Sequence, residues 1–249
     1  GFNAKAALAS MDLTMAGFQG PKKVFNGEHG YFKLIENNNY DTKYLQENIG
    51  KTWMVNQLAH KPYPSGRLTH GLVHAIKDLK LKHGLNKDDI ISIECHVPPG
   101  VYKLVARPIV DNLSTNYAKL CAKFVGASFM INNHLDIETF TEKKYLNNSD
   151  TLDFAKKITM IKNEKLDQKV LTPQKFIIKL LNNKKIEINL NDVYGHPKVP
   201  LSEKEYLDKF SKCCLSSTKK IDKNQVCQMI DFIFDLENKT NVIDFFKII

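Results

Sequence analysis

The sequence predicts an α+β fold in which a lid of mixed strands and helices is inserted between helices of an incomplete all-helical domain. Three observations support it: helical periodicity at both ends of the chain, β-type runs within residues 90–97 and 158–190, and prolines and glycines between these segments. This order along the chain predicts an end of the helical domain at 1–50, the α+β lid domain at 51–190, and C-terminal helices returning to the helical domain at 191–249.

The composition limits the classes of protein. With 249 residues, 43% of them hydrophobic, the chain can bury a substantial core. Charged residues interrupt every apolar run before the roughly 18 residues that a membrane-spanning helix needs, so no membrane association is expected. Five cysteines without C-x-x-C spacing indicate reduced thiols and a cytoplasmic location. The chain opens at Gly1 with no signal-peptide pattern, and we expect that the natural start lies upstream.

The formal charge of +9 does not indicate a nucleic-acid interface. Of the 36 basic residues all but Arg67 and Arg107 are lysines, and the lysines are scattered along the chain. Nucleic-acid readers rely on clustered basic residues and on the bidentate arginine fork. We therefore expect a solvated lysine-rich surface and no nucleic-acid partner, and we expect the two arginines to lie where a planar fork is needed.

The first 60 residues are expected to contain one long helix. Residues 3–16 carry small and apolar side chains at helical spacing and end at Gly17. A loop follows over 17–30, then a short apolar turn at 31–35. Residues 53–60 alternate weakly and run into the Lys61-Pro-Tyr-Pro segment, which predicts a strand that leads into a rigid loop.

The middle of the chain alternates between the two kinds of element. A helix is predicted from Ser65 or Gly66 to Lys82 with Gly84 as its C-terminal stop, followed by a strand over 90–97 and a turn at 98–100. Residues 102–106 are expected to be extended, and residues 116–130 to form a buried helix.

The last hundred residues complete the expected sheet and return to helices. A short helix over 150–157 precedes strands at 158–161, 175–181 and 184–190, the last two joined as a hairpin through Asn182-Asn183. Ser202 opens a helix with Glu205 as its capping-box partner. Helices over 224–236 and 242–249 are expected to end the chain.

The densest group of chemically useful residues is Lys61-Pro-Tyr-Pro-Ser-Gly-Arg-Leu-Thr-His70. It combines two cations, a hydroxyl, an imidazole and a helix N-terminus, which suits the binding of carboxylates. The alternative interpretation is a solvent-facing loop followed by an ordinary helix start, which would contain the same residue types. His70 and His74 have the spacing of zinc ligands, but Gly71 replaces the glutamate of H-E-x-x-H and no third ligand is nearby, so no metal is expected.

The second candidate is Tyr102, which follows Pro98-Pro-Gly-Val. A tyrosine placed after a turn at the end of a strand can present its phenol to a cleft and relay a proton. A tyrosine that packs its ring on the core with its hydroxyl at the surface is the commoner arrangement.

Four segments in this order resemble the MmgE/PrpD family, which includes 2-methylcitrate dehydratase, cis-aconitate decarboxylase and iminodisuccinate epimerase. They are the opening helix with Gly17-Phe-Gln-Gly-Pro21, the segment Lys61–His70, Val97-Pro-Pro-Gly-Val-Tyr102, and Gly195-His-Pro with Pro200-Leu-Ser and Lys209-Phe210. The resemblance implies a cofactor-free lyase or isomerase that acts on a small di- or tricarboxylate, in a homodimer with the active site between a helical domain and the lid.

The resemblance also implies roles for single residues. Tyr102 falls on the family's active-site tyrosine and, with His70, is expected to act as an acid/base group; Lys61, Ser65, Gly66 and Arg67 are expected to bind the substrate. Gly66 stands where the decarboxylase branch has a catalytic histidine, which argues against decarboxylation. The family's N-terminal helical half would precede Gly1, so we expect it on the same or a separate chain, and the present chain to be inactive alone. The competing hypothesis is a non-catalytic binding or scaffold module that retains the lid fold.

Overall fold

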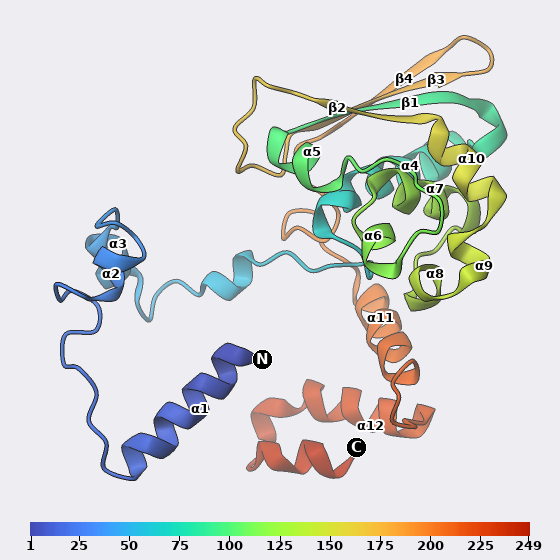
Figure 1. Cartoon of the computed structure of the whole chain (residues 1–249). Helices are drawn as coiled ribbons and strands as arrows, with labels where there is room; N and C mark the ends of the chain where they lie inside the picture. The colour runs from blue at the N-terminus through green and yellow to red at the C-terminus, as the bar shows by residue number, and fades with distance from the viewer. The chain divides into compact units, whose positions relative to one another are not determined.

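The chain forms two compact units, Gly1–Met54 and Val55–Ile249 (Figure 1). The structure is a computed structural model that describes the backbone of residues 1–249 and every side chain except that of Leu45. It confirms the predicted α+β class, with helices α1–α12 and a four-stranded mixed sheet. The predicted boundaries at residues 50 and 190 stay a prediction.

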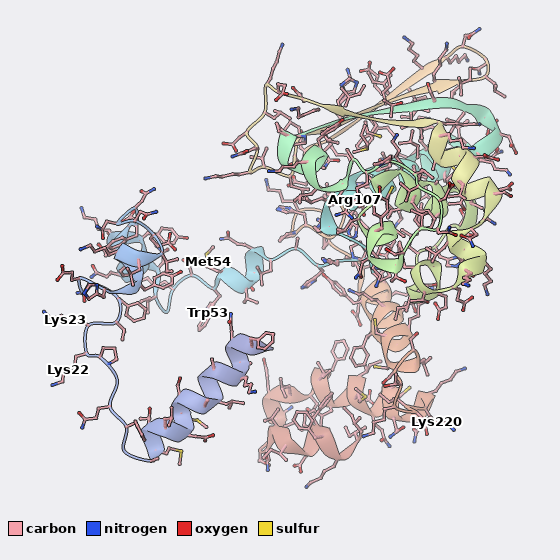
Figure 2. All side chains as sticks on the ribbon, viewed as in Figure 1. Lys22, Lys23, Trp53, Met54, Arg107 and Lys220 are labelled. Carbon is pink, nitrogen blue, oxygen red and sulfur yellow. The ribbon has the colours of Figure 1, made fainter. Side chains whose placement is uncertain are left out.

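The first unit contains α1 (Phe2–Met15), α2 (Tyr31–Leu34) and α3 (Thr42–Asn48). Helix α1 confirms the predicted first helix, and none of its side chains is buried. Figure 2 shows Lys22 and Lys23 on the connection between α1 and α2, and Trp53 and Met54 at the end of the unit. Trp53, the single tryptophan of the chain, is 69% exposed.

The sheet of the second unit has the strand order β2-β1-β3-β4. Strand β1 (Ile90–Val97) pairs in parallel with β2 (Ile158–Lys162) and antiparallel with β3 (Gln174–Leu180), which forms a hairpin with β4 (Lys185–Leu190). All four strands were predicted to within two residues. The hairpin turn contains Asn183 at φ 61°, a left-handed conformation that asparagine tolerates better than most residues.

Helices cover one face of this sheet, as Figure 1 shows. Side chains along β1 alternate between buried and more exposed, which is typical of a sheet with one face toward the core. Helices α4 (His70–His83) and α7 (Ala122–Asn132) pack against each other. Their contact includes Gly126, where a Cβ would lie 2.6 Å from Leu72 Cδ2, so the glycine permits a close approach of the two helices.

Shorter helices connect and extend this core. Between β1 and β2 they are α5 (Pro99–Val105), α6 (Thr115–Lys119), α8 (Ile137–Thr141), α9 (Lys143–Leu146) and α10 (Ser149–Lys156). After β4 come α11 (Glu203–Leu215) and α12 (Lys223–Phe234). The 3₁₀ helices are η1 (Met54–Gln57), η2 (Arg67–Thr69), η3 (Lys87–Asp89), η4 (Leu236–Asn238) and η5 (Val242–Lys247).

Two segments predicted to be extended are helical instead. The strand expected over 53–60 is wrong, since the segment contains η1 and a loop and pairs with none of the described strands. Residues 102–106 lie largely in α5, whose first residue is Pro99. Proline at the first helical position has its φ already set for a helix, and this outweighs the β-type residues that follow.

Three helix predictions need corrected bounds. The helix expected from Ser65 or Gly66 begins as the 3₁₀ helix η2 and becomes α-helical only at His70. The helix expected over 116–130 is two helices, because Cys121 is extended at φ −97°, ψ 99°. The final helix expected over 242–249 is the 3₁₀ helix η5.

The residues that end α4 and begin α11 were predicted correctly. Gly84 ends α4 in a left-handed conformation at φ 65°, and Ser202 and Glu205 form the capping box of α11. None of the described helices is both long enough and apolar enough to cross a lipid bilayer.

Candidate functional site

The candidate site is a small pocket of about 580 Å³ in the second unit. Its wall combines the loop that precedes α4 with the end of α6, two segments about fifty residues apart in sequence. The lining residues, which we call the small pocket, are Lys61, Pro64, Ser65, Gly66, Asn116, Lys119 and Leu120. Three of the predicted substrate-binding residues, Lys61, Ser65 and Gly66, therefore lie together.

A backbone hydrogen bond joins the two walls of the small pocket. The Gly66 N–H donates to the Lys119 carbonyl over 2.8 Å. A Cβ at position 66 would lie 2.6 Å from Leu120 Cδ2 and 3.4 Å from the Lys119 carbonyl oxygen, so only glycine allows this approach without displacing Leu120. The Gly66 N–H is therefore not free to bind a ligand, and the helix start expected near Ser65 is a 3₁₀ turn that becomes α-helical only at His70.

The charged residues that line the small pocket are both lysines. Lys61 is exposed and Lys119 is half-buried, while Asn116 contributes an amide and Ser65 a hydroxyl. Among the described residues that line it, none is acidic. Two ammonium groups beside neutral hydrogen-bonding groups form a surface that attracts anions such as carboxylates and phosphates.

Ser65 is joined to His70 through a chain of buried hydrogen bonds. The Thr69 hydroxyl donates to the Gly66 carbonyl over 2.8 Å, and Ser65 Oγ lies 3.0 Å from both Thr69 Oγ1 and His70 Nε2. Since the single Thr69 proton goes to the carbonyl, Ser65 donates to Thr69, and His70 Nε2–H donates to Ser65. This order fixes the tautomer and leaves Nδ1 of His70 as the unprotonated nitrogen.

His70 is fully buried and lies behind Ser65, away from the pocket wall. Burial, together with the charges of Arg67, Lys61 and Lys209, lowers its pKa to about 3. The imidazole is therefore neutral at pH 7. His70 Nδ1 is buried without a hydrogen-bond partner among the described residues.

Arg67 points to the C-terminal part of the second unit. Its Nη2 donates to the Val193 carbonyl over 3.0 Å, whereas Nε and Nη1 are buried without a partner in the described chain. Burial lowers the pKa of the guanidinium from its ordinary value, but arginine stays charged at neutral pH. Arg67 does not line the small pocket, although it directly follows Gly66.

Tyr102 also lies outside the small pocket. It occupies the first turns of α5, and its side chain is 36% exposed. Helix α5 packs against η2, the 3₁₀ turn that follows Gly66, so Tyr102 belongs to a neighbouring element of the site loop. The structure thus groups Lys61, Ser65 and Gly66 at one wall, with His70 directly behind them and Arg67 and Tyr102 on adjacent elements.

A large pocket of about 810 Å³ lies on the other side of Lys61, which lines both pockets. Its charged lining residues include four lysines and four acids: Lys61, Lys77, Lys209, Lys212, Asp136, Glu138, Glu205 and Asp208. Here the opposite charges compensate one another, as in the Lys77–Glu205 ion pair of 3.1 Å. The two pockets therefore differ in their electrostatic character.

Sequence reasoning missed Asn116 and Lys119. Both lie on α6, three residues apart and so on one side of the helix. The sequence predicted one unbroken helix over 116–130 and so gave no signal for this segment. The helix ends at Lys119 in the structure, and the Lys119 carbonyl accepts the Gly66 N–H.

The described residues contain no group of three potential metal ligands. The two histidines at ligand spacing are each engaged elsewhere, because His70 Nε2 is bonded to Ser65 and His74 Nδ1 accepts the Tyr194 N–H over 3.2 Å.

Comparison with known proteins identifies the family of the chain. The MmgE/PrpD C-terminal domain matches residues 63–231, more than half of the chain, including Ser65, Gly66, Arg67, His70 and Tyr102. Lys61 lies two residues before the matched range. No curated protein matches the chain. The family match confirms the resemblance, and the chain belongs to the MmgE/PrpD family, a family of dehydratase-like enzymes.

Proposed function

We propose that this chain is the C-terminal portion of a cofactor-free lyase or isomerase that acts on a small di- or tricarboxylate. The reaction begins with removal of a proton from the carbon α to a carboxylate. In the dehydratase form the electron pair then forms a double bond, and the hydroxyl on the β carbon leaves as water after it receives a proton. A helical N-terminal half and a second copy of the protein would complete the site.

The observation that carries this proposal is the acid-free lining of the small pocket. Lys61 and Lys119 place two cations beside Ser65 and Asn116, with none of the described lining residues acidic. Pockets for small molecules in proteins typically span about 300–1,000 Å³, and this one of about 580 Å³ falls in that range. A substrate with two or three carboxylates matches this charge distribution better than a neutral or cationic one.

Of the two predicted acid/base groups, the proposal keeps Tyr102 in that role and gives His70 a positioning role. Tyr102 is 36% exposed on α5, which packs against the turn that follows Gly66. His70 Nε2–H donates to Ser65, whose own proton goes to Thr69, so we propose that His70 holds the Ser65 oxygen in place and does not pass a proton through it. Arg67 does not line the small pocket, so we propose that it supports the site indirectly, through the hydrogen bond from Nη2 to the Val193 carbonyl that holds the turn after Gly66.

The wall at Gly66 favours dehydration or epimerisation over decarboxylation. Leu120 occupies the space that a side chain at position 66 would enter, because its Cδ2 lies only 2.6 Å from where a Cβ would stand. A histidine of the kind found in the decarboxylase branch would require Leu120 to move. The pocket of this chain is therefore shaped for a reaction that does not use that histidine.

Titration of the chain with citrate tests the carboxylate site. We expect citrate to bind, with Lys119→Met and Lys61→Met each weakening binding about fivefold or more through the loss of one ammonium-carboxylate contact. The matched control is Lys220→Met, which removes the same charge from the connection between α11 and α12 (Figure 2). Equal citrate affinity in Lys119→Met, Lys61→Met and Lys220→Met would contradict the proposed site and favour a binding or scaffold module with another ligand.

A further inference from the structure

We propose that Tyr206 and Lys209 on α11 are positioning residues that hold the backbone at His60 and Lys61 and so orient the Lys61 ammonium group toward the small pocket. This inference rests on the proposed function for the role of Lys61. The contacts themselves do not depend on which carboxylate is the substrate.

Two side chains of α11 contact the loop directly before the pocket. Lys209 Nζ donates to the Lys61 carbonyl, and the Tyr206 hydroxyl is hydrogen-bonded to His60 Nδ1. The rings of His60 and Tyr206 also meet edge to face, with centroids 5.0 Å apart. Since Tyr206 and Lys209 are three residues apart, one face of α11 supplies both contacts.

A backbone contact from the segment before α11 supports the same residues. The His60 N–H donates to the Gly195 carbonyl over 2.8 Å. Gly195 has φ 91°, and a Cβ there would collide with the His60 carbonyl oxygen. Glycine is thus required at 195 both for its left-handed conformation and for the close approach of the two segments.

Helix α11 is itself fixed to the rest of the second unit at two further points on the same side. Glu205 pairs with Lys77 on α4 at 3.1 Å, and Lys212 pairs with Asp136 before α8 at 3.2 Å. Together with Lys209 these residues have i, i+4, i+7 spacing, which places them along one stripe of the helix. The two ion pairs lie on either side of Lys209 along α11, so they fix the helix, and with it the Lys209 ammonium group, before and after the contact with the loop.

The other end of the loop is held by different residues. Gly66 is bonded to the Lys119 carbonyl, and Ser65 belongs to the buried chain with Thr69 and His70. Lys61 lies at the first of the two anchored ends, and Pro62 and Pro64 limit the backbone conformations of the residues between the ends. A lysine side chain has many rotamers, so a fixed backbone at its base narrows the positions its ammonium group can reach.

Lys209→Met tests the inference, with Lys204→Met as the matched control. Both variants remove one lysine charge from α11, but Lys209 contacts the Lys61 carbonyl whereas Lys204 is exposed to solvent. The first measurement is the ¹⁵N heteronuclear NOE of the His60 and Lys61 amides, which reports the order of the loop without any ligand. The second is the dissociation constant for citrate, measured by NMR titration.

We expect Lys209→Met to lower the NOE of the Lys61 amide and to weaken citrate binding about two- to tenfold, the factor that corresponds to one net hydrogen bond. Lys204→Met should leave both unchanged, and Lys209→Arg, which keeps a charged donor, should restore both. The inference is overturned if Lys209→Met leaves the NOE at its wild-type value, or if Lys204→Met changes both quantities equally. If wild-type chain fails to bind citrate, the proposed function fails, while the NOE comparison still decides the positioning role.

Discussion

Replacing Ser65 by alanine tests whether the buried chain Thr69–Ser65–His70 holds the site loop. Ser65 is 4% exposed and its hydroxyl lies 3.0 Å from both neighbours in that chain. Its removal leaves the His70 Nε2–H without an acceptor in a site where Nδ1 is already unpaired. Thr69 keeps its bond to the Gly66 carbonyl, so the principal loss is one buried donor.

The expected loss of stability follows from this one unpaired donor. A buried donor left without a partner costs about 1–3 kcal/mol, so we expect Ser65→Ala to lower the free energy of unfolding by about 2 kcal/mol. In a domain of this size 1 kcal/mol corresponds to about 2–4 °C, which predicts a decrease in Tm of about 4–8 °C. Thermal unfolding followed by circular dichroism measures it, and amide exchange of the β1 residues assigns the loss to the second unit.

Ser128 provides the matched control. It is 1% exposed, and its hydroxyl has no hydrogen-bond partner in the part of the chain that the structure describes. Ser128→Ala removes an unsatisfied polar group and should leave Tm unchanged or raise it slightly. If Ser65→Ala is no more destabilising than Ser128→Ala, the hydrogen-bond chain does not stabilise the loop and the reasoning about His70 and its tautomer is refuted.

Four further outcomes are expected. Arg67→Lys should lower Tm by about 2–4 °C and leave the citrate dissociation constant nearly unchanged, because Arg67 bonds the Val193 carbonyl and does not line the small pocket. Citrate binding weakened about tenfold would identify Arg67 as a contact of the ligand instead. The pKa of His70 is about 3 in the folded state, below the ordinary 6.5, so between these two pH values the unfolded state binds one more proton than the folded state. The contribution of His70 to the free energy of unfolding should be complete above about pH 6.5 and decrease as the pH falls toward 3, with a slope of at most about 1.4 kcal/mol per pH unit. Urea unfolding between pH 7 and 5 measures this, and His70→Asn should remove its part of the slope while that of His74, whose pKa burial also lowers, remains. Dialysis against EDTA should leave Tm unchanged, since both histidines at ligand spacing are bonded within the protein; a loss reversed by zinc would contradict this. The chain alone should self-associate at micromolar concentration, because Phe2, Met15, Phe234 and Phe246 are at least 67% exposed. It should show no lyase turnover, because the proposed function places part of the active site on a helical N-terminal half; a stable monomer in analytical ultracentrifugation that is also active would oppose both expectations.

The fold could be predicted wherever a few neighbouring residues determine the structure. The capping box of Ser202 and Glu205, the stop at Gly84 and the alternation along β1 are set by contacts within a few residues, and they were predicted correctly. Residues 102–106 show the limit of such patterns. Their β-type side chains were outweighed by the helix start that Pro99 provides.

The site could be predicted only in part, because half of it depends on tertiary contacts. Lys61, Ser65 and Gly66 were found since they follow one another in a loop rich in cations and prolines. Asn116 and Lys119 reach the same pocket through the bond between Gly66 and the Lys119 carbonyl, which no local pattern encodes. The burial of His70 likewise depends on Ser65 and the surrounding core. The sequence alone predicted an acid/base group that contacts the substrate, because nothing near His70 in the sequence indicates that its side chain is buried.

The distribution of acids, more than the number of lysines, determines which side of Lys61 suits an anion. On the side of the large pocket four carboxylates balance four lysines, so an incoming di- or tricarboxylate meets compensated charge. On the side of the small pocket the cations face the ligand with none of the described lining residues acidic. Charges farther away than a Debye length of about 8 Å at physiological ionic strength contribute little at the surface, so these local differences outweigh the overall charge of +9. An acid introduced at Asn116 should therefore weaken carboxylate binding more than the loss of any single distant lysine, even though the net charge of the chain stays strongly positive.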